Sequence, residues 1–171
     1  MQRMILIHGF KKLSNAMRRV AFLFFSMYRK LNSIEALDKE SKSLLNKNEI
    51  FKNKHNGRRA FVIVNGPSLK NQNLDILENE ITFVVSAFYK HDVIKKWQPT
   101  YYSILDKAFF EKTEKAQLFF NELNERIKNS IFFIPYYRGY KANLERNLLP
   151  HDKTFYIATA GLPNLKIDMT K

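Results

Sequence analysis

The chain has 171 residues, 45% of them hydrophobic and 14% aromatic, which is enough for one domain core with an appended segment. It contains no cysteine, so disulfides, thiolate zinc sites and cysteine nucleophiles are excluded, and a reducing, cytoplasmic setting fits. The formal net charge of +13 predicts affinity for polyanions: nucleic acid, anionic lipid or phosphorylated small molecules.

The excess positive charge lies mainly in the N-terminal third. Residues 1–59 carry 14 Lys and Arg against 4 Asp and Glu, whereas residues 60–171 carry 15 against 12. Residues 13–31 place apolar side chains at helical spacing, flanked by basic residues, but their apolar run is too short to span a membrane. This pattern predicts a basic amphipathic helix. The helix either lies on an anionic leaflet at the inner face of the membrane, or packs on the domain or on a partner.

Residues 35–59 are mostly polar and predict a helix followed by a linker that ends near Gly57. Residues 1–59 are therefore interpreted as a basic helical extension and linker, and residues 60–171 as the domain.

Short apolar runs rich in β-branched and aromatic residues begin after residue 59. They cover residues 60–65, 81–86 and 101–106, with two further runs at 130–135 and 154–158, and they predict parallel strands buried on both faces. Between them the sequence predicts helical turns at 69–80, a helix at 88–99 that Pro99 stops, and a longer helix at 107–128. The inward residues of that last helix are expected to be Phe109, Ala116, Phe119, Phe120 and Leu123. The predicted fold is a Rossmann-like parallel sheet in a three-layer α/β/α arrangement.

The first three predicted strands all end on small polar or acidic residues. The first ends on Asn65-Gly66-Pro67-Ser68, the second on Ser86 and the third on Asp106. Ligands of parallel α/β sheets bind outside the carboxyl ends of the strands, so these residues form a candidate binding crevice. Gly66 is expected to allow a sharp turn and the close approach of a ligand phosphate, although a Gly-Pro corner can also be purely structural.

Two other groups of residues could carry chemistry. The segment PYYRGY at 135–140 combines aromatic rings with Arg138 and could stack on a base or grip a phosphate, or simply anchor a loop. The spacing of His8, His55, His91 and His151 matches no zinc motif, so no metal site is expected.

The segments FVIVNGPSLK, NEITFVVSAFYK and QPTYYSILD, in this order and spacing, resemble the start of the bacterial family 42 sialyltransferases. They also resemble the related domain of unknown function 115, described as motility-associated glycosyltransferase or hydroxymethylpterin pyrophosphokinase-like. The resemblance covers residues 58–171, the N-terminal half of such a domain, and implies that the chain is truncated before the half that carries the catalytic histidine. No catalytic residue is therefore assigned.

The resemblance implies a nucleotide-sugar donor, such as a CMP-sialic-acid-like molecule, and a glycan acceptor, in the synthesis of bacterial surface glycans such as lipopolysaccharide. Asn65, Gly66, Pro67 and Ser68 match the turn that contacts the cytidine nucleotide. The family has asparagine at the positions of Ser86 and Asp106. The resemblance implies that these two residues also bind the donor, but the two differences leave the identity of the donor open.

Three classes of function are compatible with the sequence. The first is a nucleotide-sugar-dependent glycosyltransferase peripheral to the membrane. The second is a diphosphokinase-like enzyme of the same fold, which would need Mg²⁺ and carboxylates such as Asp106. The third is a basic nucleic-acid or interaction module, although no nucleic-acid-binding signature is present and no specific nucleic acid is expected.

Overall fold

The computed structural model describes residues 20, 22–24 and 39–158 of the chain. The predicted helix at 13–31 lies outside this part except for residues 20 and 22–24, which are helical, with Val20 and Phe24 exposed. The chain divides into two compact units, one made of residues 43–159 and one of residues 1–42 with 160–171. Within the described ranges, none of the helices combines the length and hydropathy needed to cross a bilayer.

The unit of residues 43–159 is built on a sheet of five parallel strands in the order β1-β2-β3-β4-β5. The strands are β1 (Ala60–Ile63), β2 (Ile81–Val85), β3 (Tyr101–Ser103), β4 (Ile131–Pro135) and β5 (Thr154–Ile157). In register, Val62 lies opposite Phe83, which lies opposite Tyr101. The five apolar runs thus form parallel strands, and the fold is of the predicted α/β, Rossmann-like class. The first three strands end one to three residues earlier than predicted, and the expected burial on both faces is wrong for β1, where Val62 is 71% exposed.

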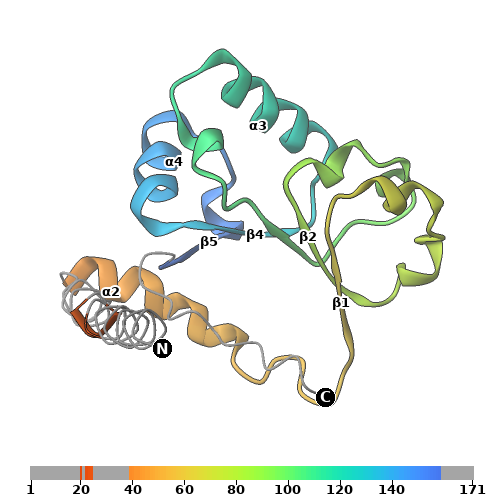
Figure 1. Cartoon of the computed structure of the whole chain (residues 1–171), viewed down its shortest axis with the longest axis horizontal. Coiled ribbons are helices and arrows are strands. Elements are labelled where there is room, and N and C mark those ends of the chain that lie inside the picture. The colour runs from red at the N-terminus through yellow and green to blue at the C-terminus, as the bar shows by residue number, and fades with distance from the viewer. Residues whose placement is uncertain (1–19, 21, 25–38, 159–171) are drawn as a thin grey trace, which may run out of the picture. The chain divides into compact units, whose positions relative to one another are not determined.

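Helices cover one face of this sheet. Crossovers between parallel strands are nearly always right-handed, so a sequential strand order carries every crossover over the same face. Accordingly, α3 (Glu114–Arg126) and α4 (Lys141–Arg146) lie on one side of the strands (Figure 1). The core under them contains fully buried side chains from the sheet and from α3, among them Val84, Tyr102, Phe120, Leu123, Phe132 and Ile134.

The other face of the sheet is covered over β3, β4 and β5 by a short 3-10 segment that precedes β1, whereas Val62 of β1 on the same face is exposed. This segment, η2 (Lys47–Phe51), follows α2 (Lys39–Asn46). The Phe51 ring packs edge-on against Tyr101, Phe133 and Phe155, with ring centroids 5.7, 5.2 and 4.7 Å away. The second covering layer therefore comes from residues before the first strand, because no crossover lies on that face.

Two of the predicted helices are broken into shorter pieces. The predicted helix at 88–99 is wrong: the chain forms two 3-10 segments, η5 (Ser86–Lys90) and η6 (Asp92–Lys95), separated by the extended residue His91. His91 Nδ1 accepts the backbone N–H of Val93 at 3.2 Å, so the side chain caps η6 and ends helical continuity.

The predicted helix at 107–128 divides in the same way. It consists of η7 (Lys107–Phe110) and α3, because the hydroxyl of Thr113 accepts the N–H of Ala116 and begins a new helix. Four of the five predicted inward residues, Ala116, Phe119, Phe120 and Leu123, are buried on α3. Phe109 instead belongs to η7 and is half-buried, with its ring centroid 4.1 Å from that of Phe119.

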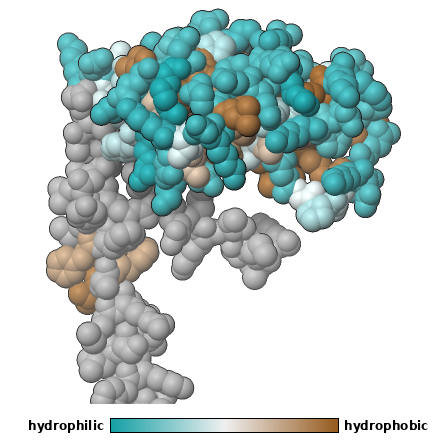
Figure 2. Space-filling view, turned by 90° about the horizontal axis from the view of Figure 1, so that it is seen from above, coloured by the Kyte–Doolittle hydropathy of each residue, from teal (hydrophilic) through white to brown (hydrophobic). Residues whose placement is uncertain are grey.

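The remaining connections are short 3-10 segments: η3 (Pro67–Asn71), η4 (Asp75–Leu77) and η9 (His151–Lys153). The first two confirm the helical turns predicted between β1 and β2. Seen from above, the described residues present a mostly hydrophilic surface with small separate hydrophobic patches (Figure 2).

Candidate functional site

The carboxyl ends of β1, β2 and β3 lie at the same edge of the sheet, as the sequence predicts. The three strands are adjacent, parallel and in register, which brings Asn65, Ser86 and Asp106 to this edge. Asn65 Nδ2 donates a hydrogen bond to the carbonyl oxygen of Val85 at 3.0 Å and so joins the ends of β1 and β2. Because Asn65 is exposed, its amide oxygen and its second N–H stay available to a ligand.

Ser86 occupies a strained backbone conformation directly after β2. Its φ of 48° lies in the left-handed region, which costs a non-glycine residue about 1–2 kcal/mol. The buried hydroxyl of Tyr102 holds this conformation, because it donates to the Ser86 carbonyl oxygen at 2.6 Å and accepts the Tyr89 N–H at 2.9 Å. Burial raises the pKa of Tyr102, so the hydroxyl keeps the proton that it donates. Strained residues of this kind concentrate at functional sites.

Gly66 does not make the sharp turn that the sequence predicted. Its φ of −157° and ψ of 161° are extended values that any residue adopts, and the chain turns in η3, where the Leu69 N–H donates to the Gly66 carbonyl oxygen at 3.0 Å. A Cβ added at Gly66 would meet no heavy atom within 4 Å. The space beside Gly66 is therefore open, and the fold itself does not require a glycine at this position.

The other predicted residues present polar groups to solvent. Pro67 and Ser68 are exposed in η3, and Asp106 is exposed after β3. Asp106 Oδ1 accepts the Ala108 N–H at 3.0 Å and thereby caps η7, which leaves the second carboxylate oxygen open. The predicted residues thus offer amide, hydroxyl and carboxylate groups, and none of them is a cation.

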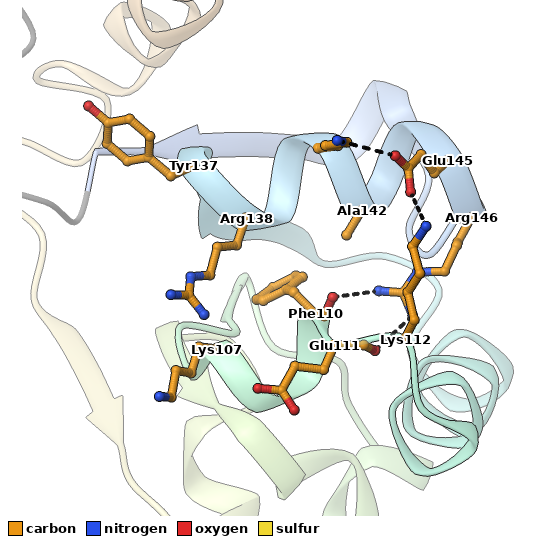
Figure 3. A pocket seen from close by; sticks show the side chains of 10 residues that line it. Lys107, Phe110, Glu111, Lys112, Tyr137, Arg138, Ala142, Glu145 and Arg146 are labelled. Carbon is orange, nitrogen blue, oxygen red and sulfur yellow. Dashed lines mark hydrogen bonds and ion pairs between the residues drawn. The ribbon is translucent and has the colours of Figure 1, made fainter.

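A pocket of about 380 Å³ opens at the same edge of the sheet, after β3 and β4 (Figure 3). Its walls are η7, the π-helical turn η8 (Tyr136–Tyr140) and α4. The lining residues are Lys107, Phe110, Glu111, Lys112, Tyr137, Arg138, Lys141, Ala142, Glu145 and Arg146. The PYYRGY segment indicates Tyr137 and Arg138 in the sequence, whereas no sequence pattern indicates Lys107, although it directly follows Asp106.

The lining contains five cationic side chains and two carboxylates. Glu145 is paired with Lys112 at 2.9 Å and with Lys141 at 3.8 Å, and the hydrogen bond from Lys112 is the main cause of its lowered pKa. Arg146 donates to the carbonyl oxygens of Phe110 and Glu111, at 3.0 and 3.1 Å, and its buried Nε has no partner. The pocket therefore carries an excess of positive charge.

The position of η8 is fixed by close packing on β4. A Cβ added at Gly139 would lie 2.9 Å from Cδ1 of Ile134 and 3.0 Å from its Cγ1, and Ile134 is fully buried. Only glycine lets this turn approach the strand so closely. Single π-helical turns are frequent at functional sites, and this one sets the direction in which Arg138 leaves the backbone.

Within the part of the chain that the structure describes, no three His, Asp or Glu side chains come together in a way that could hold a metal ion. Comparisons of the chain with protein-family models, with curated proteins and with solved structures found no match in any of the three.

Proposed function

We propose that the carboxyl edge of this sheet binds the nucleotide-sugar donor of a glycosyltransferase. The observation that carries the proposal is that Asn65, Ser86 and Asp106 end three adjacent parallel strands at one edge. Ligands of open α/β sheets bind outside this edge. The resemblance of the segments around these residues to the family 42 sialyltransferases also supports the proposal and points to a CMP-sialic-acid-like donor.

The chemistry of the three strand ends suits hydroxyl groups and the edges of a base. The open oxygen of Asp106 can accept from a ribose or sugar hydroxyl, and a carboxylate would repel a phosphate at the same place. Asn65 can both donate to and accept from a base edge. The open space at Gly66 admits a ligand close to the backbone.

In the proposed reaction, the bond between the donor sugar and its phosphate breaks, and a hydroxyl of the glycan acceptor forms the new bond to the sugar. The nucleotide leaves, and a general base takes the proton of the attacking hydroxyl. We assign no residue to the role of this base.

The test is the substitution Gly66→Val, followed by calorimetric titration of CMP, UMP and GDP at fixed ionic strength. Valine favours the extended backbone found at this position, and its Cβ meets no heavy atom within 4 Å, so the sheet should fold normally. We expect the valine side chain to occupy the space of the ligand and to weaken binding of the preferred nucleotide by about tenfold or more. A loss of this size equals that of one hydrogen bond to a charged group. Ser68→Ala, which removes one hydroxyl, should cost about 0.5–1.5 kcal/mol of binding free energy.

The control is Ala60→Val, which also introduces the isopropyl side chain of valine but lies at the amino end of β1, where Ala60 is exposed. It should leave nucleotide binding unchanged. Saturable binding that survives Gly66→Val would show that the turn is a structural corner and would remove the proposal. Binding that strictly requires Mg²⁺ would favour the diphosphokinase-like alternative.

A further inference from the structure

We propose that the pocket between η7 and η8 is a separate binding site for the phosphate group of a small molecule, with Arg138 and Lys107 as its ligand-binding cations. The site lies after β3 and β4, whereas the Asn65–Ser68 turn follows β1. The inference does not depend on the nucleotide-sugar proposal.

Arg138 and Lys107 are the cations of the lining whose charge is uncompensated. Neither makes a hydrogen bond or an ion pair with any described residue, and both are exposed. The three remaining cations are engaged: Lys112 and Lys141 with Glu145, and Arg146 with two backbone carbonyl oxygens. A side chain already held by a partner gains less from a ligand than one that exchanges only water for it.

The two free cations come from different elements and extend to the same side of the pocket. In Figure 3, Arg138 reaches down from η8 and Lys107 extends from η7, both on the same side of the Phe110 ring, and no interaction is drawn to either. Gly139 fixes η8 against β4, and the Asp106 cap fixes the start of η7, so both cations begin from well-anchored backbone. An anion between them would be held from two sides.

The chemistry of the pair favours a phosphate group. The planar guanidinium of arginine can bind two phosphate oxygens at once, and lysine adds a compact point charge. A pocket of about 380 Å³ is larger than a phosphate and falls in the range of small-molecule sites, so there is room for an attached ring. Tyr137 borders the pocket and is 48% exposed, but its ring points away from Arg138 and Lys107, and the aromatic ring beside these two cations is that of Phe110 (Figure 3).

Glu111 is the feature of the lining that opposes an anion. It is exposed, and its carboxylate has no partner among the described residues. Removal of its charge should therefore strengthen phosphate binding. A variant that binds more tightly is informative, because misfolding would weaken binding and not strengthen it.

The experiment titrates the full chain with inorganic phosphate and with ribose 5-phosphate at constant ionic strength. We expect saturable binding with one site per chain. Arg138→Gln should weaken it by about tenfold or more, Lys107→Gln should weaken it by a smaller factor, and Glu111→Gln should tighten it. Ribose 5-phosphate should bind more tightly than inorganic phosphate if its ring enters the pocket, and equal affinities would restrict the site to the phosphate group.

Two matched controls separate the pocket from the general attraction of a basic chain for anions. Arg58→Gln and Lys115→Gln remove the same charges at exposed positions outside the pocket and should leave affinity within about twofold of the unsubstituted chain. The Nε–H resonance of Arg138 should also shift on titration with phosphate. An equal loss of affinity in the controls, or no saturable binding of either ligand, would overturn the proposal.

Gly66→Val distinguishes this proposal from the nucleotide-sugar proposal. It should leave phosphate binding intact, because Gly66 does not line the pocket. If Gly66→Val abolished phosphate binding while Arg138→Gln did not, the anion would bind at the Asn65–Ser68 turn and the pocket would be excluded.

Discussion

The strained residue Ser86 depends on a single buried hydroxyl. Tyr102 bridges the Ser86 carbonyl oxygen and the Tyr89 N–H, and its side chain is completely buried. The sequence shows only a tyrosine in an apolar strand, because the bridge joins β3 to the residues after β2 and exists only once the two strands pair. Sequence analysis therefore placed Ser86 at the strand end but could not predict its left-handed backbone.

Tyr102→Phe tests this bridge. The phenyl ring keeps the packing, but the Tyr89 N–H and the Ser86 carbonyl oxygen lose their partner, so we expect the free energy of unfolding to fall by about 1–3 kcal/mol. Ser86→Gly should change it by less than about 1 kcal/mol, because relief of backbone strain offsets the greater freedom of the unfolded chain. Ser86→Val should destabilise by more than Ser86→Gly. Urea unfolding of the three variants measures these differences, and equal stabilities of the glycine and valine variants would show that Ser86 is not strained.

At the scale of elements, the strands and the helical turns between β1 and β2 were predictable, whereas the breaks within the two longer predicted helices were not. Each strand is a continuous apolar run, a pattern that is typical of parallel sheets and visible in the sequence alone. The apolar run of β1 did not, however, predict its burial, because Val62 is exposed. The breaks at His91 and Thr113 arise where a side chain accepts a backbone N–H two or three residues later. Such local hydrogen bonds compete with helix formation, and apolar periodicity does not reveal them.

The pocket was only partly predictable for a related reason. The strand pattern placed Asn65, Ser86 and Asp106 at one edge, and the aromatic segment with Arg138 stood out by composition. The pocket, however, joins η7 to η8 and α4, which are distant in sequence. Only the pairing of β3 with β4, with Ser103 opposite Phe133, brings these segments together.

The packing of η8 on β4 leads to a prediction for the whole turn. Gly139→Ala places a methyl group against the buried side chain of Ile134, so η8 must move away from the strand. We expect a loss of about 1–3 kcal/mol in the free energy of unfolding. Binding of phosphate should weaken as well, since Arg138 moves with the turn. Urea unfolding and phosphate titration measure the two effects.

Ile134→Val provides the matched second variant, because it removes the Cδ1 atom that lies nearest to the added methyl group. Alone, Ile134→Val should lower the free energy of unfolding by about 0.5–1.5 kcal/mol. In the double variant with Gly139→Ala, the loss of free energy should be smaller than the sum of the two single losses, because the two residues share one contact. Additive costs, with phosphate affinity unchanged, would mean that η8 is not positioned by this contact.

At the scale of the whole molecule, the net charge of +13 opposes compaction, and local ion pairs offset part of that repulsion. The pairs include Arg59 with Glu80, Lys95 with Asp92 at 2.6 Å, and Lys112 with Glu145 at 2.9 Å. These are surface pairs, which contribute little individually. Their combined effect should appear in the dependence of stability on pH.

The pKa values of Glu80, Asp92 and Glu145 are lowered in the folded chain, in each case mainly by a hydrogen bond from the paired cation. A carboxyl group whose pKa is lower when folded contributes stability above its unfolded pKa and loses it as the pH falls through the folded value. We therefore expect the free energy of unfolding to decrease as the pH falls below the ordinary glutamate value of 4.5. Below that pH the 29 Lys and Arg side chains repel one another with fewer carboxylates to offset them, so added NaCl should raise the melting temperature more than it does at neutral pH.

Glu80→Gln should reduce the dependence of stability on pH, because it removes the ion pair with Arg59. Glu125→Gln should leave that dependence unchanged, because Glu125 is exposed and makes no hydrogen bond or ion pair among the described residues. Calorimetric melting across this pH range, with and without NaCl, measures both effects, and stability that stays constant or rises on acidification would show that the ion pairs are not formed in solution.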